Sequence, residues 1–345
     1  MNGVSGRFLF DNGFSLSVVN EDFAQKANID FDQSTNIIDA NSKSSQVREA
    51  TVDTVTILGH KFVETGFYQI NTDAFLPCTD VDGVIGASII NKINWEIDFR
   101  NKKINLSQTP FQSDGVAIKM NYISNNSALI NLQIKGKTIK HKVDFGRSGG
   151  INLSQEKLSS LFANERVEKR IGISSLSANG LGNIDSFYTT ADKFEIAYNQ
   201  TVLPSKDKIE LSNRLKYPGY IGIDYFNEYL VVLNSTEKQM ILSEFKPDTT
   251  DANGNKSYGI AIYPVEEKWK IIQLNPQIPS LKKSWLMSEV DLLDNQPIDR
   301  FRDICEYREY IDSKTEKEES LILLLKDIGD TIKLEYQEPP TIILE

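Results

Sequence analysis

The chain has 345 residues, of which 40% are hydrophobic, and it carries a formal net charge of -10. This length predicts two or three domains, and the composition is typical of a globular rather than a disordered protein. Phosphate binding needs a basic stripe, and the sequence shows none, which argues against a nucleic-acid partner.

The sequence offers few residues for metal or thiol chemistry. Its two histidines are His60 and His141, and its two cysteines, Cys78 and Cys305, lie far apart along the chain. We therefore expect no metal site, no cofactor and no disulfide. No apolar run approaches the roughly 20 residues of a membrane helix, so we also expect no transmembrane segment in this chain.

The first 245 residues contain an internal repeat, which we identify from three landmarks that each occur twice. The first landmark is an extended run that ends in Asp-x-Gly-x-Ser, with copies centred on Asp11 and Asp144. The second is an apolar pair before a glycine, and the third is a predicted hairpin, at residues 95–107 and 231–243. Equivalent positions are 133 residues apart at the first landmark and 136 at the other two, which indicates duplication.

Segments rich in Thr, Val, Ile and Tyr lie between the landmarks and alternate in polarity, which predicts strands. Examples are residues 51–58, 62–70 and 187–197. The second half begins with a further predicted strand at residues 128–134, which has no counterpart in the first half. We therefore expect an N-terminal strand, and any targeting segment before it, to be missing from the chain.

The paired Asp-x-Gly motifs have the residues that acid–base hydrolysis requires. Two carboxylates held a few ångströms apart share one proton, so that one acts as base on a water and the other as acid on a carbonyl. Glycine after each Asp allows close approach, and a nearby hydroxyl can hydrogen-bond the carboxylate. The alternative is that each Asp-x-Gly is an ordinary turn, which two copies in register make unfavourable.

A Ser-His-Asp triad of Ser148, His141 and Asp144 is a further alternative. Neighbouring residues of one strand point to opposite faces, and triads are assembled from distant segments. We therefore reject it.

The repeat resembles the pepsin-like and retropepsin-like aspartic peptidases, whose signature is apolar-apolar-Asp-Thr/Ser-Gly-Ala-Ser/Thr followed by apolar-apolar-Gly. The resemblance covers residues 4–245. It implies a mostly β fold with two pseudo-symmetric acid-protease β-barrel lobes, at residues 1–112 and 113–247, and a polypeptide substrate. A flap hairpin is expected within residues 40–70, and Gly86 and Gly222 are expected beneath the Asp loops.

By the same resemblance, Asp11 and Asp144 are the catalytic residues. The residues that support the two Asp loops are Asn12, Gly13, Ser15, Phe145, Gly146 and Ser148.

The sequence departs from the signature beside each Asp. Asn12 and Phe145 replace the Thr or Ser whose hydroxyl braces the opposite loop in the family, and Arg147 replaces a small residue and could pair with Asp144. Two functions therefore remain open: an aspartic endopeptidase, or an inactive homologue that binds extended peptides. A third possibility is a scaffold whose two carboxylates lie far apart.

A separate unit is expected after a polar linker at residues 248–256. Residues 258–263, 268–272 and 331–336 are predicted strands, and Asp299 is expected to cap a helix that follows it.

This order resembles a PDZ-like αβ domain at residues 256–345. In that family a Gly-apolar-Gly-apolar loop binds a peptide carboxylate, and the matching residues here are Gly259, Ile260, Ala261 and Ile262. The alternative is a small domain that only packs against the lobes. Proteins that combine both units look like exported bacterial proteins, which implies a cell-envelope location.

Overall fold

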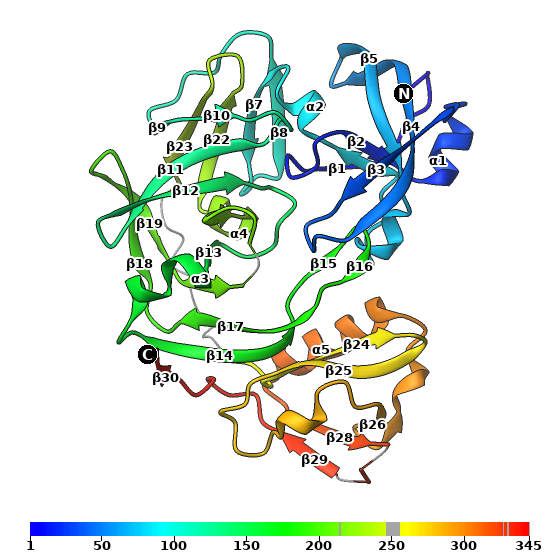
Figure 1. The fold of residues 1–345 in the computed structure, drawn as a ribbon. Helices are drawn as coiled ribbons and strands as arrows, with labels where there is room; N and C mark the ends of the chain where they lie inside the picture. The colour runs from blue at the N-terminus through cyan, green and yellow to red at the C-terminus, as the bar shows by residue number, and fades with distance from the viewer. Residues whose placement is uncertain (214, 246–255, 327, 330, 345) are drawn as a thin grey trace.

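Strands dominate the computed structural model, which describes residues 1–213, 215–245, 256–326, 328–329 and 331–344 (Figure 1). None of the helices in these ranges has the length and apolar content needed to span a bilayer. The helices, including single 3-10 turns labelled η, are α1 (Glu21–Lys26), η1 (Thr72–Ala74), α2 (Ala87–Ile90), α3 (Gln155–Leu158), η2 (Ser159–Phe162), α4 (Ile223–Phe226), η3 (Lys283–Trp285), η4 (Ile298–Arg300) and α5 (Ile304–Glu316).

The first half of the chain forms a six-stranded sheet (blue in Figure 1). Its strands, in spatial order, are β1 (Phe8–Phe10), β6 (Gly83–Ile85), β2 (Ser17–Val19), β5 (His60–Gln69), β4 (Ser44–Ile57) and β3 (Gln33–Ile38). β1 runs parallel to β6, with Leu9 opposite Val84. Asp11 follows β1 directly, so this pairing sets its position.

The second half forms most of a 13-stranded sheet. In spatial order its main path is β19 (Thr201–Asp207), β18 (Phe194–Tyr198), β11 (Ala128–Ile134), β12 (Lys137–Val143), β21 (Gly219–Ile221), β13 (Ile151–Ser154), β20 (Ile209–Ser212), β17 (Ile184–Thr190), β14 (Arg166–Ile173), β25 (Lys268–Leu274) and β24 (Ile260–Val265). Two short strands join at the side: β10 (Asn121–Tyr122) pairs with β11, and β30 (Ile342–Ile343) pairs with β14.

The two halves repeat one strand order. In the first half the pairs β1-β6, β6-β2 and β2-β5 are parallel, antiparallel and parallel in turn. In the second half the pairs β12-β21, β21-β13 and β13-β20 follow the same order. β17 and β14 then follow as β4 and β3 do. Lys142 lies opposite Tyr220 in the second half, as Leu9 lies opposite Val84 in the first. The duplication seen in the sequence is therefore also a duplication of the sheet.

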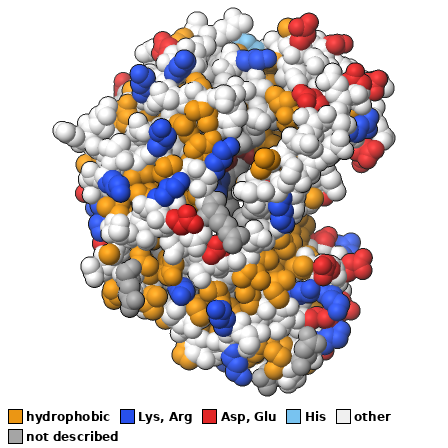
Figure 2. Space-filling model, in the orientation of Figure 1, with side chains coloured by type: hydrophobic (Ala, Val, Ile, Leu, Met, Phe, Trp, Pro, Cys, Tyr) orange, Lys and Arg blue, Asp and Glu red, His pale blue; other side chains and the backbone are white. Residues whose placement is uncertain are grey.

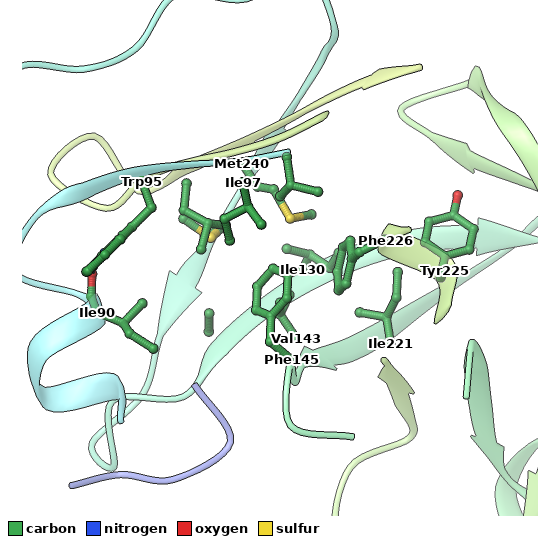
Figure 3. Packing of buried hydrophobic residues seen from close by; sticks show 14 of the residues in the cluster. Ile90, Trp95, Ile97, Ile130, Val143, Phe145, Ile221, Tyr225, Phe226 and Met240 are labelled. Carbon is green, nitrogen blue, oxygen red and sulfur yellow. The ribbon is translucent and has the colours of Figure 1, made fainter. Parts of the chain in front are cut away.

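A third sheet contains strands from both halves. Its order is β8 (Lys103–Ser107), β7 (Asn94–Asp98), β22 (Tyr229–Asn234), β23 (Gln239–Glu244) and β9 (Val116–Lys119). β7 and β22 are the equivalent strands of the two predicted hairpins, and they pair antiparallel with each other. Figure 3 shows the buried core beneath them, where Trp95 and Ile97 of the first half share one cluster with Phe145 and Phe226 of the second.

The C-terminal unit, residues 256–344, is built around a second buried cluster, which contains Trp269, Trp285 and Phe301 and is joined by Ile171 of β14. Its hairpin of β24 and β25 extends the second-half sheet through β14. A separate sheet contains β27 (Gln296–Pro297), β26 (Val290–Leu293), β28 (Leu321–Leu325) and β29 (Thr331–Leu334). Of the predicted linker, residues 248–255 lie outside the described residues.

The helix of this unit begins later than the sequence suggested. Asp303, not Asp299, is the N-cap of α5, and its carboxylate accepts hydrogen bonds from the N–H groups of Cys305 and Glu306. Asp299 lies in the preceding 3-10 turn η4. Both Asp residues stand a few positions before the apolar residues of the helix, so the capping rule alone did not separate them.

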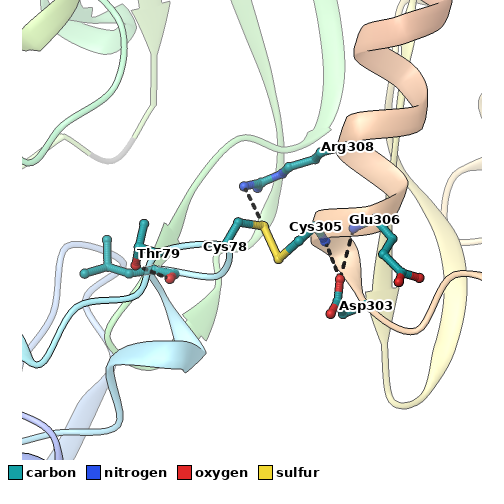
Figure 4. The surroundings of a disulfide bond; sticks show 7 residues. Cys78, Thr79, Asp303, Cys305, Glu306 and Arg308 are labelled. Atoms are coloured by element: carbon teal, nitrogen blue, oxygen red, sulfur yellow. Dashed lines mark hydrogen bonds between the residues drawn. A yellow bond between two sulfur atoms is a disulfide. The ribbon is translucent and has the colours of Figure 1, made fainter.

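The expectation that the chain has no disulfide was wrong. Cys78, in the loop after η1, is bonded to Cys305, in the first turn of α5, and their Cα atoms are 5.2 Å apart (Figure 4). Arg308, one turn further along α5, donates a hydrogen bond to the sulfur of Cys78. Distance along the chain does not measure distance in space, and here the docking of the C-terminal unit brings the cysteines together.

Candidate active site

The structure brings Asp11 and Asp144 to one place between the two halves. The N–H of each Asp donates a 3.0 Å hydrogen bond to the residue before the landmark glycine, Ile85 for Asp11 and Ile221 for Asp144. The two carboxyl groups lie close together, because a Cβ atom on Gly13 would be 2.3 Å from Oδ1 of Asp144 and 2.8 Å from Oδ1 of Asp11. The hypothesis of a scaffold with distant carboxylates is therefore wrong.

The glycines of the two loops allow this approach. A Cβ atom on Gly13 would collide with the carboxyl groups of both Asp144 and Asp11, and a Cβ on Gly146 would overlap that of Asp11. Gly86 and Gly222 play a similar part beneath the loops, where a Cβ would meet backbone carbonyl oxygens. The close approach of the two carboxyl groups thus requires glycine at positions 13 and 146.

Asp11 is the buried member of the pair, with 6% of its surface exposed. Its Oδ1 accepts hydrogen bonds from the N–H of Gly13 (2.6 Å) and from the N–H of Gly146 (3.1 Å) in the other half. Burial raises the pKa of Asp11 to about 7, and the neighbouring charge of Asp144 adds to this effect. The Gly13 hydrogen bond and the charge of Lys142 oppose it. Asp11 therefore keeps its proton at a pH where an isolated Asp is ionised.

Lys142, which the sequence analysis did not single out, lies beside Asp144. Its Nζ is 3.4 Å from Oδ2 of Asp144 and donates a 3.1 Å hydrogen bond to the carbonyl oxygen of Gly13 in the other half. The sequence could have predicted that Lys142 lies beside Asp144, because residues two apart at the end of a strand point to the same face. The expected ion pair of Asp144 with Arg147 is not formed: the Arg147 guanidinium lies over the ring of Tyr220, 5.1 Å from its centroid.

Asn12 and Phe145 occupy the two brace positions and behave differently. Asn12 is buried, and its Oδ1 accepts a 2.9 Å hydrogen bond from the backbone N–H of Phe145, across the two halves. The Phe145 ring turns into the core and stacks on Phe226 at 4.7 Å between centroids (Figure 3). A side-chain amide and a backbone N–H thus provide one cross-brace where the family uses hydroxyls.

The hydroxyls of Ser15 and Ser148 make no hydrogen bond within the described part of the chain, in contrast to the expectation. In the first half the hydroxyl of Ser17 accepts a 3.0 Å hydrogen bond from the N–H of Gly86 instead. His141 is fully buried, with Nδ1 2.9 Å from the carbonyl oxygen of Ile139, and burial lowers its pKa to about 4. It is a core residue and contacts neither Ser148 nor Asp144 through a hydrogen bond, which agrees with rejecting the triad.

Two equivalent hairpins meet at their tips (Figure 1). The first connects β3 to β4 and has its tip at residues 39–43, near the start of the range expected for a flap. The second connects β14 to β17 and carries β15 (Leu176–Ser177) and β16 (Gly180–Leu181). Asp39 accepts hydrogen bonds from the hydroxyl of Ser177 and the N–H of Asn179, and Nζ of Lys43 donates to the carbonyl of Leu181 at 2.6 Å. Polar side chains therefore join the two halves at this second place.

The predicted peptide-binding residues Gly259, Ile260, Ala261 and Ile262 lie in the C-terminal unit, at the start of β24. Gly259 has φ +72°, and a Cβ there would collide with Ile278. Its N–H donates to the hydroxyl of Ser257, and its carbonyl accepts from Asn275. The other three residues begin β24, which pairs with β25 on one side. Among the described residues, no group of His, Cys, Asp and Glu side chains could hold a metal ion.

Comparison with known proteins bears on the first half of this site. Residues 1–89, which include Asp11, match the family model described as aspartyl protease. A solved structure, a retropepsin-like aspartic protease from Rickettsia conorii, is 14% identical and covers 39% of this chain and 95% of its own, with a TM-score of 0.25. No curated protein matches the chain. The sequence similarity to aspartyl proteases is thus established for the part of the chain that carries the first Asp-x-Gly motif.

Proposed function

We propose that the chain is an aspartic-type endopeptidase that hydrolyses peptide bonds with a water activated between Asp11 and Asp144. The observation that carries the proposal is the close approach of the two carboxyl groups, of which Asp11 is buried and has its pKa raised to about 7. Such a pair shares one proton over a broad range of acidic pH, which general acid–base hydrolysis needs. The aspartyl protease match of residues 1–89 supports the same reaction.

The surroundings of the two carboxyl groups assign them different roles. Asp144 lies beside the Lys142 ammonium group and is the ionised base that removes a proton from the water. The water oxygen bonds to the carbonyl carbon, and the protonated Asp11 gives its proton to the carbonyl oxygen. The resulting diol collapses as the amide nitrogen takes the proton now held by Asp144 and one diol hydroxyl returns its proton to Asp11. The C=O bond reforms, the C–N bond breaks, and the pair regains its starting protonation.

Cleavage of a denatured protein tests this proposal. We expect turnover within about pH 3 to 8, inhibition by a statyl-type mimic of the diol, and a loss of about 10² to 10⁴ in kcat for Asp11→Asn or Asp144→Asn. Asp53→Asn is the matched control, since Asp53 is exposed on β4. Absence of turnover at every pH in this range would contradict the proposal.

The second candidate function is an inactive homologue that binds extended peptides. The contact between Lys142 and Asp144 favours it, because an ammonium group at 3.4 Å competes with water for the carboxylate. The two candidates separate on one measurement: labelled peptides that bind to the wild-type chain and remain intact support the binding protein.

For the C-terminal unit we propose a PDZ-like domain at residues 256–345 that binds peptide ends, next to lobes at residues 1–112 and 113–247. The second buried cluster and the order of β24, β25, β26, α5 and β28 support the proposal. Titration with peptides that end in a free or an amidated carboxylate tests it. Equal affinity for both forms would contradict carboxylate recognition at Gly259.

A further inference from the structure

The duplication allows the two sides of the carboxyl pair to be compared residue by residue. Three positions surround each Asp: the residue two before it, the strand partner of that residue, and the residue three after it. With the first-half member named first, these positions hold Leu9 and Lys142, Val84 and Tyr220, and Phe14 and Arg147. Each first-half residue is apolar, whereas the second half has two cations and a tyrosine.

The first-half positions belong to an apolar surface that continues away from the Asp loop. Leu9 and Phe14 pack in one cluster with Phe75 and Leu76, and the Phe14 and Phe75 rings are 5.7 Å apart. The same cluster includes Ile37 of the β3–β4 hairpin and Ala178 of the opposite hairpin tip. It therefore extends from the first Asp loop to the hairpins, along the space between them.

The second-half positions carry an uncompensated positive charge. A carboxyl pair that shares one proton has one negative charge, and Lys142 balances it at 3.4 Å from Asp144. Arg147 contacts the Tyr220 ring and forms no ion pair within the described residues. Two carboxylates bind backbone N–H groups shortly after Arg147: Oδ2 of Asp224 accepts from Gly149, and Oδ2 of Asp207 accepts from Ile151.

Figure 2 shows the molecule hollowed between the two halves, with hydrophobic side chains and Lys or Arg side chains both present at the rim. By their register beside the two Asp residues, Leu9 and Phe14 flank the carboxyl pair in the first half, and Lys142 and Arg147 flank it in the second. Burying an apolar side chain is favourable, and a guanidinium group binds a carboxylate with two parallel hydrogen bonds.

We propose that the site selects peptides with an apolar residue on one side of the scissile bond and an acidic residue on the other, and that Arg147 recognises the acidic side chain. The proposal rests on the proposed function, because it takes the carboxyl pair as the centre of a peptide-binding cleft.

Matched peptides test the selectivity. Each carries Leu on one side of the central bond and Glu, Gln or Lys on the other, and both orders are made. In one order we expect kcat/KM for the Glu peptide to exceed that for the Gln peptide about tenfold, with the Lys peptide lowest. Arg147→Gln should remove the preference, and Arg147→Glu should reverse it towards Lys. Arg166→Gln is the control, since Arg166 is an exposed arginine on β14 that pairs with Asp192.

Binding of the same peptides, measured by fluorescence anisotropy, separates this inference from the proposed function. Preferential binding of the Glu peptide without any cleavage supports the selectivity and contradicts the hydrolase. Cleavage with equal kcat/KM for Glu and Gln in both orders overturns the selectivity alone. Circular dichroism of the Arg147 variants checks that they fold, and Arg147→Lys, which keeps the charge, should retain part of the preference.

Discussion

The two Asp loops have equivalent backbones and unequal surroundings. Around Asp11 the neighbours are apolar, and two backbone N–H groups hold a buried carboxyl group. Around Asp144 the neighbours are Lys142 and Arg147. The duplicated sheet fixes where the two carboxyl groups lie, whereas burial, which is not equal in the two halves, raises the pKa of Asp11.

The largest expected effect comes from filling the space that the loops share. In Gly146→Ala the new Cβ overlaps the carboxyl group of Asp11, so we expect kcat/KM to fall at least about 100-fold and the free energy of unfolding to fall by about 1 to 3 kcal/mol. Peptide cleavage and urea unfolding measure these changes. In the control Gly66→Ala, the nearest atom is a flexible Leu16 methyl group at 3.4 Å. Wild-type activity of Gly146→Ala would show that the carboxyl groups do not share this space.

Replacing Lys142 by leucine makes the second Asp loop resemble the first. Lys142→Leu introduces the residue found at the equivalent position 9, and it removes a charge that lowers the pKa of Asp11. That pKa should rise, so the alkaline limb of kcat/KM should move to higher pH, with a loss of about tenfold in kcat. The exposed Lys140, two residues upstream, provides the control Lys140→Leu. An unchanged pH profile would mean that Lys142 has only a structural role.

The raised pKa of Asp11 should also make the free energy of unfolding depend on pH. Its pKa is about 7 in the folded protein and near 3.8 in an unfolded chain, so between these values the folded state binds more protons. The free energy of unfolding should therefore fall as pH rises from about 4 to about 7, by at most about 1.4 kcal/mol per pH unit. Asp11→Asn should flatten this slope in urea unfolding at pH 4, 5, 6 and 7. An equal slope in both proteins would contradict the raised pKa.

The smallest effect is expected at the hairpin tips. Asp39→Ala removes two hydrogen bonds between the halves, each worth about 1 kcal/mol, and should change KM and peptide dissociation a few-fold while leaving the pH profile unchanged. Asn36→Ala, at an exposed position of the same hairpin, is the control. The substitution also removes the bonds that Asp39 accepts from the N–H groups of Asn41 and Lys43 in its own tip. Hydrogen exchange at Asn179 therefore reports the contact with the opposite tip, and unaltered exchange there would argue against that contact in solution.

Much of the site could be predicted because the chain contains its pattern twice. Similar offsets at the three landmarks, 133 and 136 residues, placed Asp11 and Asp144 in equivalent loops, and the glycines indicated that the loops could approach closely. Lys142 was predictable too, from its two-residue spacing to Asp144, but a search for motifs passes over a single lysine. No sequence pattern predicts the hydrogen bond from the Phe145 N–H to Asn12, because every residue except proline has a backbone N–H.

The contacts of the C-terminal unit could not be predicted from the chain in this way. Its hairpin joins the second half by backbone hydrogen bonds between β14 and β25, which any extended sequence can form. The pairing of Cys78 with Cys305 depends on that docking and on the loop after η1. Local patterns indicate elements, whereas the places where distant elements meet depend on their packing.

The Cys78–Cys305 disulfide holds the chain together after proteolytic cleavage. All of the second half, with Asp144, lies inside the covalent ring that this bond closes. A proteolytic cut in any loop between these cysteines leaves both fragments attached. Such a molecule would migrate as one species without reductant and as two with it, so that the partners in the carboxyl pair would survive proteolysis together.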